Sequence, residues 1–324
     1  MLTLSHIHKT YRVARRNAGM KNAVKALFQR EYETVHALND ISFTIRDGEM
    51  VGYIGPNGAG KSSTIKVMSG ILTPDCGECV IDGLTPWKNR REHVKNIGVV
   101  FGQRSQLWWD VPVADSFALL RGLYDVEPAA YRRDLAELTE TLELGTLLKT
   151  PARQLSLGQR MRCEIAASLL HRPKLLFLDE PTIGLDAVSK NAVRAFVKRM
   201  NRERGTTVIL TTHDMQDIEA LTERILLIGK GRILLDGALN DIKERYARRR
   251  TVTVTYAGGE FPLAEGLSQV ETSGGRAVFA VDTQALPISR AIALLSGALE
   301  VRDLCVEGVS AEEMVLQLYE EFHL

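Results

Sequence analysis

A glycine-rich octapeptide has the residue types and spacing of a phosphate-binding loop. Residues 55–62 read Gly-Pro-Asn-Gly-Ala-Gly-Lys-Ser and fit the pattern G-x-x-x-x-G-K-[ST]. Glycines let such a loop curl tightly, so that backbone N–H groups point at phosphate oxygens. The pattern predicts that Lys61 bridges the β- and γ-phosphates of a nucleotide and that the Ser62 hydroxyl ligates Mg²⁺. The residues expected to bind the nucleotide are Gly55, Pro56, Asn57, Gly58, Ala59, Gly60, Lys61 and Ser62.

Two carboxylates follow an apolar run that is typical of a buried strand. The run is Leu175–Leu178, and Asp179 and Glu180 come directly after it. Ligands of a parallel sheet lie beyond the carboxyl ends of its strands, so both acids are expected to face the nucleotide. We expect Asp179 to hold Mg²⁺, mostly through water, and Glu180 to act as the general base or to position the attacking water. The alternative is an acidic strand end without catalytic function.

A histidine ends a similar run farther along the chain. His213 follows the strand-like segment Thr206–Thr212. We expect its side chain to reach the γ-phosphate side of the nucleotide. A single histidine at a strand end is usually structural, so this role depends on the other motifs being present.

The elements that must position these groups alternate between strands and helices. The apolar run Met50–Ile54 leads into the phosphate loop, and the residues from Ser62 to Gly70 indicate a helix. This alternation predicts an α/β domain with a mainly parallel sheet. Further strands are expected at Leu175–Leu178 and Thr207–Leu210, and further helices at Gly158–His171 and Ala187–Arg204.

Patterns with a two-residue period lie on both sides of this region. Ile41–Ile45 precedes the turn Asp47-Gly48, which predicts a strand and a hairpin. The composition changes near Lys243–Arg250, where arginines cluster, and Thr251–Tyr256 and Ala277–Val281 then alternate like strands. The arginine run is interpreted as a solvated linker, with a lipid or nucleic-acid contact as the alternative.

The pattern therefore divides the chain into two domains. A large α/β domain is expected over residues 1–244, and a small α+β domain over residues 245–324. Ser310 and Glu313 form a capping box that opens a last helix.

Composition excludes several classes of protein. The 324 residues carry a net charge of +1, which gives no overall attraction to nucleic acid or anionic lipid. The longest stretch without a charged residue, Met50–Gly60, is too short to span a bilayer, and Met1–Tyr11 does not have the pattern of a secretory signal. The 4 cysteines do not make a disulfide framework in a chain of this length. We therefore expect a cytoplasmic protein.

With these motifs, the sequence resembles the ABC-type ATPase family over about residues 1–240. Leu155–Gln159 is similar to the family's signature motif, which is usually written L-S-G-G-Q. Gln103 stands where the Q-loop glutamine is expected, and Pro181–Asp186 resembles the D-loop. His213 is similar to the switch histidine, and Tyr11 is placed like the aromatic residue that stacks on adenine.

The resemblance implies a P-loop NTPase domain of ABC type, with a helical signature subdomain and the small C-terminal α+β domain. It implies ATP as substrate and Mg²⁺ as cofactor. Ser63 stands where threonine is common and is also expected to bind the nucleotide. The residues to which catalytic roles carry over are Glu180, His213, Gln103 and Asp186, and those expected at the metal are Ser62, Gln103 and Asp179.

The signature motif implies a dimer. Gln159 opens a helix, so Ser156, Gly158 and Gln159 present a second anion site. In the family, two ATPase domains pair head to tail, and each signature covers the ATP of the other. The chain is therefore expected to pair with a second copy or with a related ATPase. Leu157 replaces the usual glycine, which leaves the neighbouring contacts in place.

Three segments bear on what the ATPase drives. The segment 12–35 is basic, and its apolar residues have the spacing of an amphipathic helix: Val24, Leu27, Phe28, Tyr32 and Val35. Such a helix is interpreted as a contact to a membrane or a partner, or as an insertion that packs on its own domain. Trp108 and Trp109 follow Gln103, where the resemblance places the coupling helix of a membrane subunit. The C-terminal domain resembles the extension of ABC-2-type exporter ATPases.

These features predict the ATP-binding and hydrolysing subunit of an exporter. It is expected to act on the cytoplasmic face of the cell membrane, peripherally, beneath separate integral membrane permease subunits, and without direct contact to nucleic acid. The alternatives are a soluble ABC ATPase that acts on nucleic acid or ribosomes, and an importer ATPase.

Overall fold

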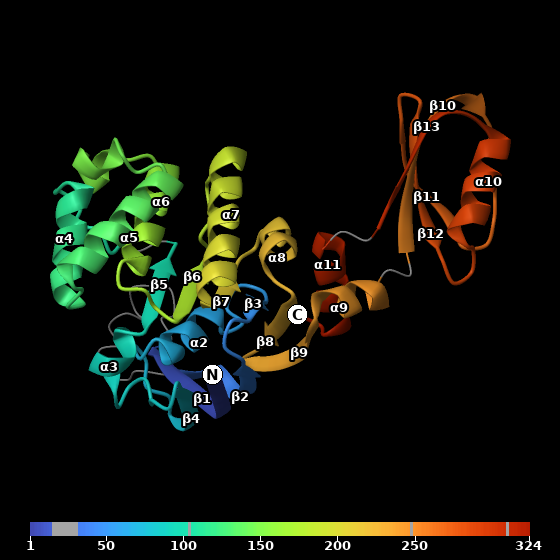
Figure 1. The fold of residues 1–324 in the computed structure, drawn as a ribbon. Coiled ribbons are helices and arrows are strands. Elements are labelled where there is room, and N and C mark those ends of the chain that lie inside the picture. The colour runs from blue at the N-terminus through green and yellow to red at the C-terminus, as the bar shows by residue number, and fades with distance from the viewer. Residues whose placement is uncertain (15–31, 103–104, 247–248, 309–310) are drawn as a thin grey trace, which may run out of the picture. The chain divides into compact units, whose positions relative to one another are not determined.

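The computed structural model describes residues 1–14, 32–102, 105–246, 249–308 and 311–324 (Figure 1). Contacts divide the chain into two compact units, Met1–Asp236 and Gly237–Leu324, and each unit has its own hydrophobic core. This division rests on contacts within the chain and does not test which residues belong to each functional domain. The predicted domain limits, 1–244 and 245–324, therefore stay a prediction.

The centre of the first unit is a six-stranded sheet in the order β5-β6-β7-β3-β8-β9. The pairs β5–β6, β6–β7, β7–β3 and β3–β8 are parallel. The apolar runs predicted as strands are almost completely buried here, because a parallel sheet is covered on both faces. The predicted α/β class is confirmed. The strands are β3 (Met50–Ile54), β5 (Ile97–Phe101), β6 (Leu175–Asp179), β7 (Thr207–Thr211), β8 (Arg224–Gly229) and β9 (Arg232–Ala238).

A second, antiparallel sheet belongs to the same unit. Its order is β2-β1-β4, with β1 over Leu2–Ala14, β2 over Tyr32–Ile45 and β4 over Cys76–Ile81. One continuous core, which includes Leu4, Phe43, Tyr53 and Phe177, joins the two sheets.

Two predictions made for this region are wrong. The turn after Ile45 does not close a hairpin, because β2 pairs with β1 while β3 enters the parallel sheet. Tyr32 and Val35 lie on strand β2, where Val35 is the register partner of Tyr11, and not on a helix. Both side chains are exposed, so their spacing does not mark a buried helical face. Val24, Leu27 and Phe28 lie outside the described residues.

Helices cover the sheet edges and faces of the first unit. The group α4, α5 and α6 lies together beside β5 (Figure 1). Helix α7 has the predicted limits and buries the predicted apolar face of Val193, Phe196, Val197 and Met200. The helices are α2 (Lys61–Met68), α3 (Arg90–Val94), α4 (Val113–Leu123), α5 (Pro128–Thr141), α6 (Leu157–Leu169), α7 (Ala187–Arg204) and α8 (Met215–Leu221), with 3-10 turns at Leu147–Lys149 and Ala152–Gln154.

The second unit is an antiparallel sheet with helices. The sheet order is β11-β12-β10-β13, and α10 packs on it through Ala291 and Leu295, against Val252 and Phe279. Helices α9 and α11 contact each other. The elements are α9 (Leu239–Tyr246), β10 (Arg249–Gly259), β11 (Leu267–Ser273), β12 (Arg276–Asp282), α10 (Ile288–Ala298), β13 (Leu299–Glu307) and α11 (Ala311–Glu321).

Part of the arginine run is helical, which corrects its interpretation as a linker. Arg245 lies on α9 and its Nη2 is 3.8 Å from Glu321 Oε1 on α11. The proposed capping residue Ser310 lies outside the described residues. In the part of the chain that the structure describes, no helix has the length and apolar character needed to cross a membrane.

The four cysteines are free thiols. Cys79 and Cys163 are buried, whereas Cys76 on β4 and Cys305 on β13 are exposed. Burial raises the pKa of Cys79 to about 12, and burial together with the neighbouring carboxylate of Glu164 does the same for Cys163.

Candidate functional site

The phosphate-loop sequence forms a curled turn between β3 and α2. Gly60 is left-handed, with φ +117°, and the Thr64 N–H donates to its carbonyl at 2.9 Å in the first turn of α2. Lys61 Nζ donates to the carbonyls of Gly55 at 2.6 Å and Pro56 at 3.1 Å, so its side chain folds back over the loop. Lys61 is 8% exposed. Burial lowers the pKa of its ammonium, while the carboxylates of Glu180 and Asp179 act in the opposite direction.

One pocket of about 680 Å³ opens at this loop. Its wall joins the loop, the start of α2, part of β2, the ends of β5 and β6 and the second residue after β7. Nine of the residues predicted for the site line it: Asn57, Gly58, Gly60, Lys61, Ser62, Ser63, Asp179, Glu180 and His213.

The two carboxylates and the histidine meet at the carboxyl edge of the sheet. The Thr211 hydroxyl donates to Asp179 Oδ1. Glu180 has a positive φ of 58°, a rare conformation for a residue with a side chain, and its N–H donates to the Thr211 carbonyl at 2.9 Å. His213 Nε2 lies 3.0 Å from Glu180 Oε1. Burial raises the pKa of Glu180, the His213 imidazole opposes this, and Asp179 adds to it.

Other predicted residues lie outside the pocket wall. Ser156 caps α6 in a capping box, in which Gln159 N–H donates to Ser156 Oγ at 3.3 Å and Ser156 N–H to Gln159 Oε1 at 2.9 Å. Asp186 caps α7 by accepting from the Ser189 N–H at 2.8 Å. These two helix starts adjoin, since a Cβ added to Gly158 would lie 3.1 Å from Ser189 Oγ.

The remaining predicted residues have different positions. Tyr11 lies on β1, directly opposite the pocket residue Val35. Gly55, Pro56 and Ala59 form the loop without lining the pocket, although two of them accept from Lys61. Gln103 lies outside the described residues.

Several pocket residues were not predicted as site residues. Lys66 lies one turn along α2 from the loop, so its closeness in sequence to the loop could have indicated it. Val35 and Ala37 reach the pocket on β2, and no motif near them in the sequence indicates this. The unpredicted lining residues are Val35, Ala37, Lys66, Ile71, Phe101, Gly102 and Ile183.

Gly60→Ala is expected to destabilise the loop more than Gly58→Ala. A Cβ on Gly60 would lie 2.7 Å from the Ala37 carbonyl oxygen, in addition to the strain of φ +117°. Gly58 has φ +80° and nothing within 4 Å of the added Cβ, so the stability loss of Gly58→Ala measures the backbone strain without a steric clash. We expect a loss of about 1–2 kcal/mol for Gly58→Ala and roughly 3 kcal/mol for Gly60→Ala. Urea unfolding of both variants measures the difference, and equal losses would contradict the close approach of the Gly60 and Ala37 backbones.

Comparisons with known proteins agree with this geometry. Residues 38–183 match the family model described as ABC transporter. The ABC transporter ATP-binding protein NatA of Bacillus subtilis is 30% identical over 67% of this chain and 88% of its own length. The linearmycin resistance ATP-binding protein LnrL of the same organism is 32% identical over 71% of this chain and 73% of its own length. The methionine import ATP-binding protein MetN of Latilactobacillus sakei is 32% identical over 68% of this chain and 65% of its own length.

Solved structures give the same result. A dimeric structure of the ATP-binding cassette MJ0796, in a post-hydrolysis state with ADP and Pi, is similar with a TM-score of 0.62 and 28% identity. The match covers 74% of this chain and 99% of that one. The loop, the acidic strand end and the relatives agree, and the chain belongs to the ABC transporter family as an ATP-binding subunit that hydrolyses ATP.

Proposed function

We propose that this chain powers an exporter by hydrolysing MgATP in the described pocket, paired head to tail with a second copy or a related ATPase, beneath separate membrane permease subunits. The observation that carries the proposal is the meeting of Lys61, Asp179, Glu180 and His213 around one pocket. A cation, a metal-binding carboxylate, a base and a polar partner for that base are the groups that phosphoryl transfer to water requires.

The loop binds the phosphates. Backbone N–H groups of residues 57–60 and the start of α2 offer hydrogen bonds to phosphate oxygens, and Lys61 supplies the positive charge. In this role the Lys61 ammonium exchanges the carbonyls of Gly55 and Pro56 for the β- and γ-phosphates. Tyr11, beside Val35, is proposed to stack on the adenine.

The donor set fits Mg²⁺. The Ser62 hydroxyl and the Asp179 carboxylate line the same pocket, and Mg²⁺ prefers a few such hard oxygen ligands together with phosphates and water. When bound, the ion would neutralise charge on the β- and γ-phosphates. Asp179 is held for this role by the Thr211 hydroxyl. The role of Gln103 at the metal stays a prediction.

Glu180 is proposed to take the proton of the attacking water. Its raised pKa brings a carboxylate closer to the basicity that a general base needs near neutral pH. His213, 3.0 Å away, is proposed to fix the orientation of the carboxylate and to contact the γ-phosphate. Both residues thus act as one unit at the pocket wall.

The signature segment is proposed to cover the nucleotide of the other subunit. The capped start of α6 at Ser156 lies outside the pocket of its own chain. Its Gly158 N–H is proposed to bind an anion of the facing nucleotide. Asp186, at the adjoining start of α7, is proposed to contact the facing site. The dimeric state of the solved relative supports this arrangement.

Export is the direction that we propose. LnrL carries linearmycin resistance in its name, and export of a toxic compound is one way in which a transporter confers resistance. MetN carries import in its name, so an importer ATPase is the second candidate. The chain is proposed to act at the cytoplasmic face of the membrane, with residues 245–324 as an accessory domain and without nucleic acid as a partner.

The permease contact is proposed at the exposed tryptophan pair. The exposed fractions of Trp108 and Trp109 are 47% and 51%, and Arg160 lies over the Trp109 ring at 5.5 Å. Exposed aromatic side chains of this kind are typical anchors of protein interfaces. Trp87, in contrast, packs against the core.

A pull-down of the tagged chain from native membranes in mild detergent tests the proposal. We expect an integral membrane protein in stoichiometric amount, and we expect the double change Trp108→Ala and Trp109→Ala to reduce its recovery with no change in MgATP affinity. The control is Leu263→Ala, which truncates a fully exposed apolar side chain elsewhere. Ribosomes or nucleic acid in place of a membrane protein would contradict the transport function.

The direction of transport needs a second readout. Cells that express the chain with its permease are expected to tolerate a toxic compound that the transporter exports, and Glu180→Gln is expected to abolish this tolerance. A requirement of the same cells for the chain during growth on a limiting nutrient would favour import.

A further inference from the structure

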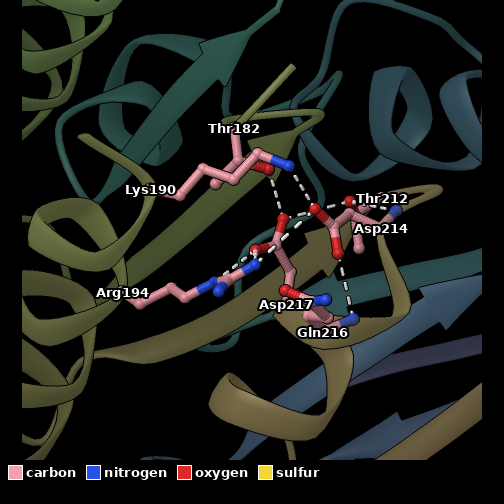
Figure 2. Close-up of polar contacts among 7 residues, drawn as sticks. All are labelled: Thr182, Lys190, Arg194, Thr212, Asp214, Gln216 and Asp217. Atoms are coloured by element: carbon pink, nitrogen blue, oxygen red, sulfur yellow. Dashed lines mark hydrogen bonds and ion pairs between the residues drawn. The ribbon is translucent and has the colours of Figure 1, made fainter. Parts of the chain in front are cut away.

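A network of polar side chains connects α7 and α8 to Thr182 and Thr212, which lie close in sequence to Glu180 and His213 (Figure 2). At its centre is Asp217, in the first turn of α8, whose side chain is completely buried. Arg194 of α7 binds Asp217 Oδ1 through Nε at 2.6 Å and Nη2 at 2.5 Å. The attraction of the guanidinium and its hydrogen bond offset the cost of removing the carboxylate from water.

The second oxygen of Asp217 accepts two hydroxyl groups. The Thr182 and Thr212 hydroxyls both donate to Asp217 Oδ2, the latter at 3.2 Å. Thr182 lies two residues after Glu180, and Thr212 lies one residue before His213. One carboxylate oxygen therefore connects the two chain segments that carry the paired side chains.

The segment after His213 is held from the same side. Asp214 Oδ1 accepts from the Gln216 N–H at 3.0 Å, and the Asp214 N–H donates to Thr212 Oγ1 at 3.0 Å. Asp214 Oδ2 contacts Lys190 Nζ and lies 3.6 Å from Arg194 Nη2. Helix α7 thus holds the residue after His213 directly, through Lys190 and Arg194, whereas Thr212 before it is held through Asp217.

We propose that Asp217 is a positioning residue for hydrolysis: its Oδ2, shared by Thr182 and Thr212, sets the contact between Glu180 and His213. This inference rests on the roles proposed for Glu180 and His213. Without the shared oxygen, no hydrogen bond of this network joins the Glu180 segment to the His213 segment, and the 3.0 Å contact between the two side chains is no longer fixed by it.

A purely structural role is the competing explanation, because a buried ion pair between α7 and α8 also holds the fold. The two roles differ in how the effects of losing the two hydrogen bonds to Asp217 Oδ2 combine; these bonds, from Thr182 and from Thr212, are called the two arms of the network. A link between two segments fails when either arm is removed, so removing the second arm causes no further loss of kcat. Two independent packing contacts would contribute separately.

Thr182→Val and Thr212→Val cut one arm each and keep the shape of the side chain. Each is expected to lower kcat by about 10- to 100-fold, the size of effect that misplaced catalytic groups produce. The affinity for MgATP is expected to stay at the wild-type value, because neither threonine contacts the phosphate loop. Thr212 also accepts from Asp214, so the double variant is expected to equal Thr212→Val alone.

Thr222→Val is the matched control. Thr222 is a buried threonine at the end of α8 whose hydroxyl donates to the Ile218 carbonyl at 2.9 Å. It is expected to lower thermal stability to a similar extent as the other two variants, with wild-type kcat. Circular dichroism melts of all variants verify that each is folded.

The outcomes separate this inference from the proposed function. Wild-type kcat in the threonine variants, or losses that multiply in the double variant, would overturn the role of Asp217. A change in MgATP affinity with unchanged kcat would also overturn it. Glu180→Gln is measured in parallel: if that variant keeps wild-type turnover, the proposed function itself is wrong, whatever the threonine variants do.

Discussion

The Glu180→Gln variant is expected to bind MgATP with wild-type affinity and to hydrolyse it roughly 10²- to 10⁴-fold more slowly. The amide keeps the shape of the side chain but does not accept a proton from water. Lys61 and the phosphate loop are unchanged, so nucleotide binding persists. Because the bound ATP is not consumed, the nucleotide-loaded dimer is expected to accumulate.

Two measurements check this result. Steady-state phosphate release gives kcat, and size-exclusion chromatography with MgATP is expected to show a dimer for Glu180→Gln and less dimer for the wild type. Glu49→Gln is the control, because Glu49 is a half-buried glutamate of the same unit that pairs with Arg224 at 2.9 Å. Turnover of Glu180→Gln at the wild-type rate would remove Glu180 from the mechanism.

Lys61→Ala is expected to weaken MgATP binding on the order of 10- to 100-fold, the equivalent of one hydrogen bond to a charged group. The ammonium is the one side-chain cation held against the loop carbonyls, at 2.6 Å from Gly55 and 3.1 Å from Pro56 among the described residues. Alanine leaves the phosphates with backbone donors only. Lys66→Ala removes a less buried pocket lysine one turn along α2, and a smaller loss is expected.

Isothermal titration calorimetry of both lysine variants measures the affinities. A circular dichroism melt of Lys61→Ala accompanies it, because the ammonium also ties the two ends of the loop together. Unchanged MgATP affinity in a folded Lys61→Ala protein would contradict the assignment of residues 55–62 as the phosphate loop.

Local patterns made much of the fold predictable. The octapeptide 55–62 and the acidic strand end at Asp179 depend on neighbouring residues, and the structure brings them to one pocket. The limits of α7 follow from periodicity and from caps at Asp186 and Gly205. Each of these signals lies within a few residues of the feature that it predicts.

Pairing between distant segments was not predictable in the same way. The turn at Asp47-Gly48 is real, yet nothing local decides that β2 pairs with β1 and not with β3. Val35 reaches the pocket only through that register. Thr182 and Asp217 are 35 residues apart, and no spacing rule connects a D-loop threonine to a buried acid on α8, beyond α7 and β7.

Two of the four cysteines are exposed and two are buried, so the chain can be labelled at two positions without mutation. Cys79 and Cys163, with their pKa raised to about 12, remain protonated and resist alkylation at neutral pH. Maleimide dyes are therefore directed to Cys76 in the first unit and Cys305 in the second, and neither residue lines the pocket. The native sequence thus accepts a donor and an acceptor fluorophore, and energy transfer between them follows the distance between the two units while ATP is turned over.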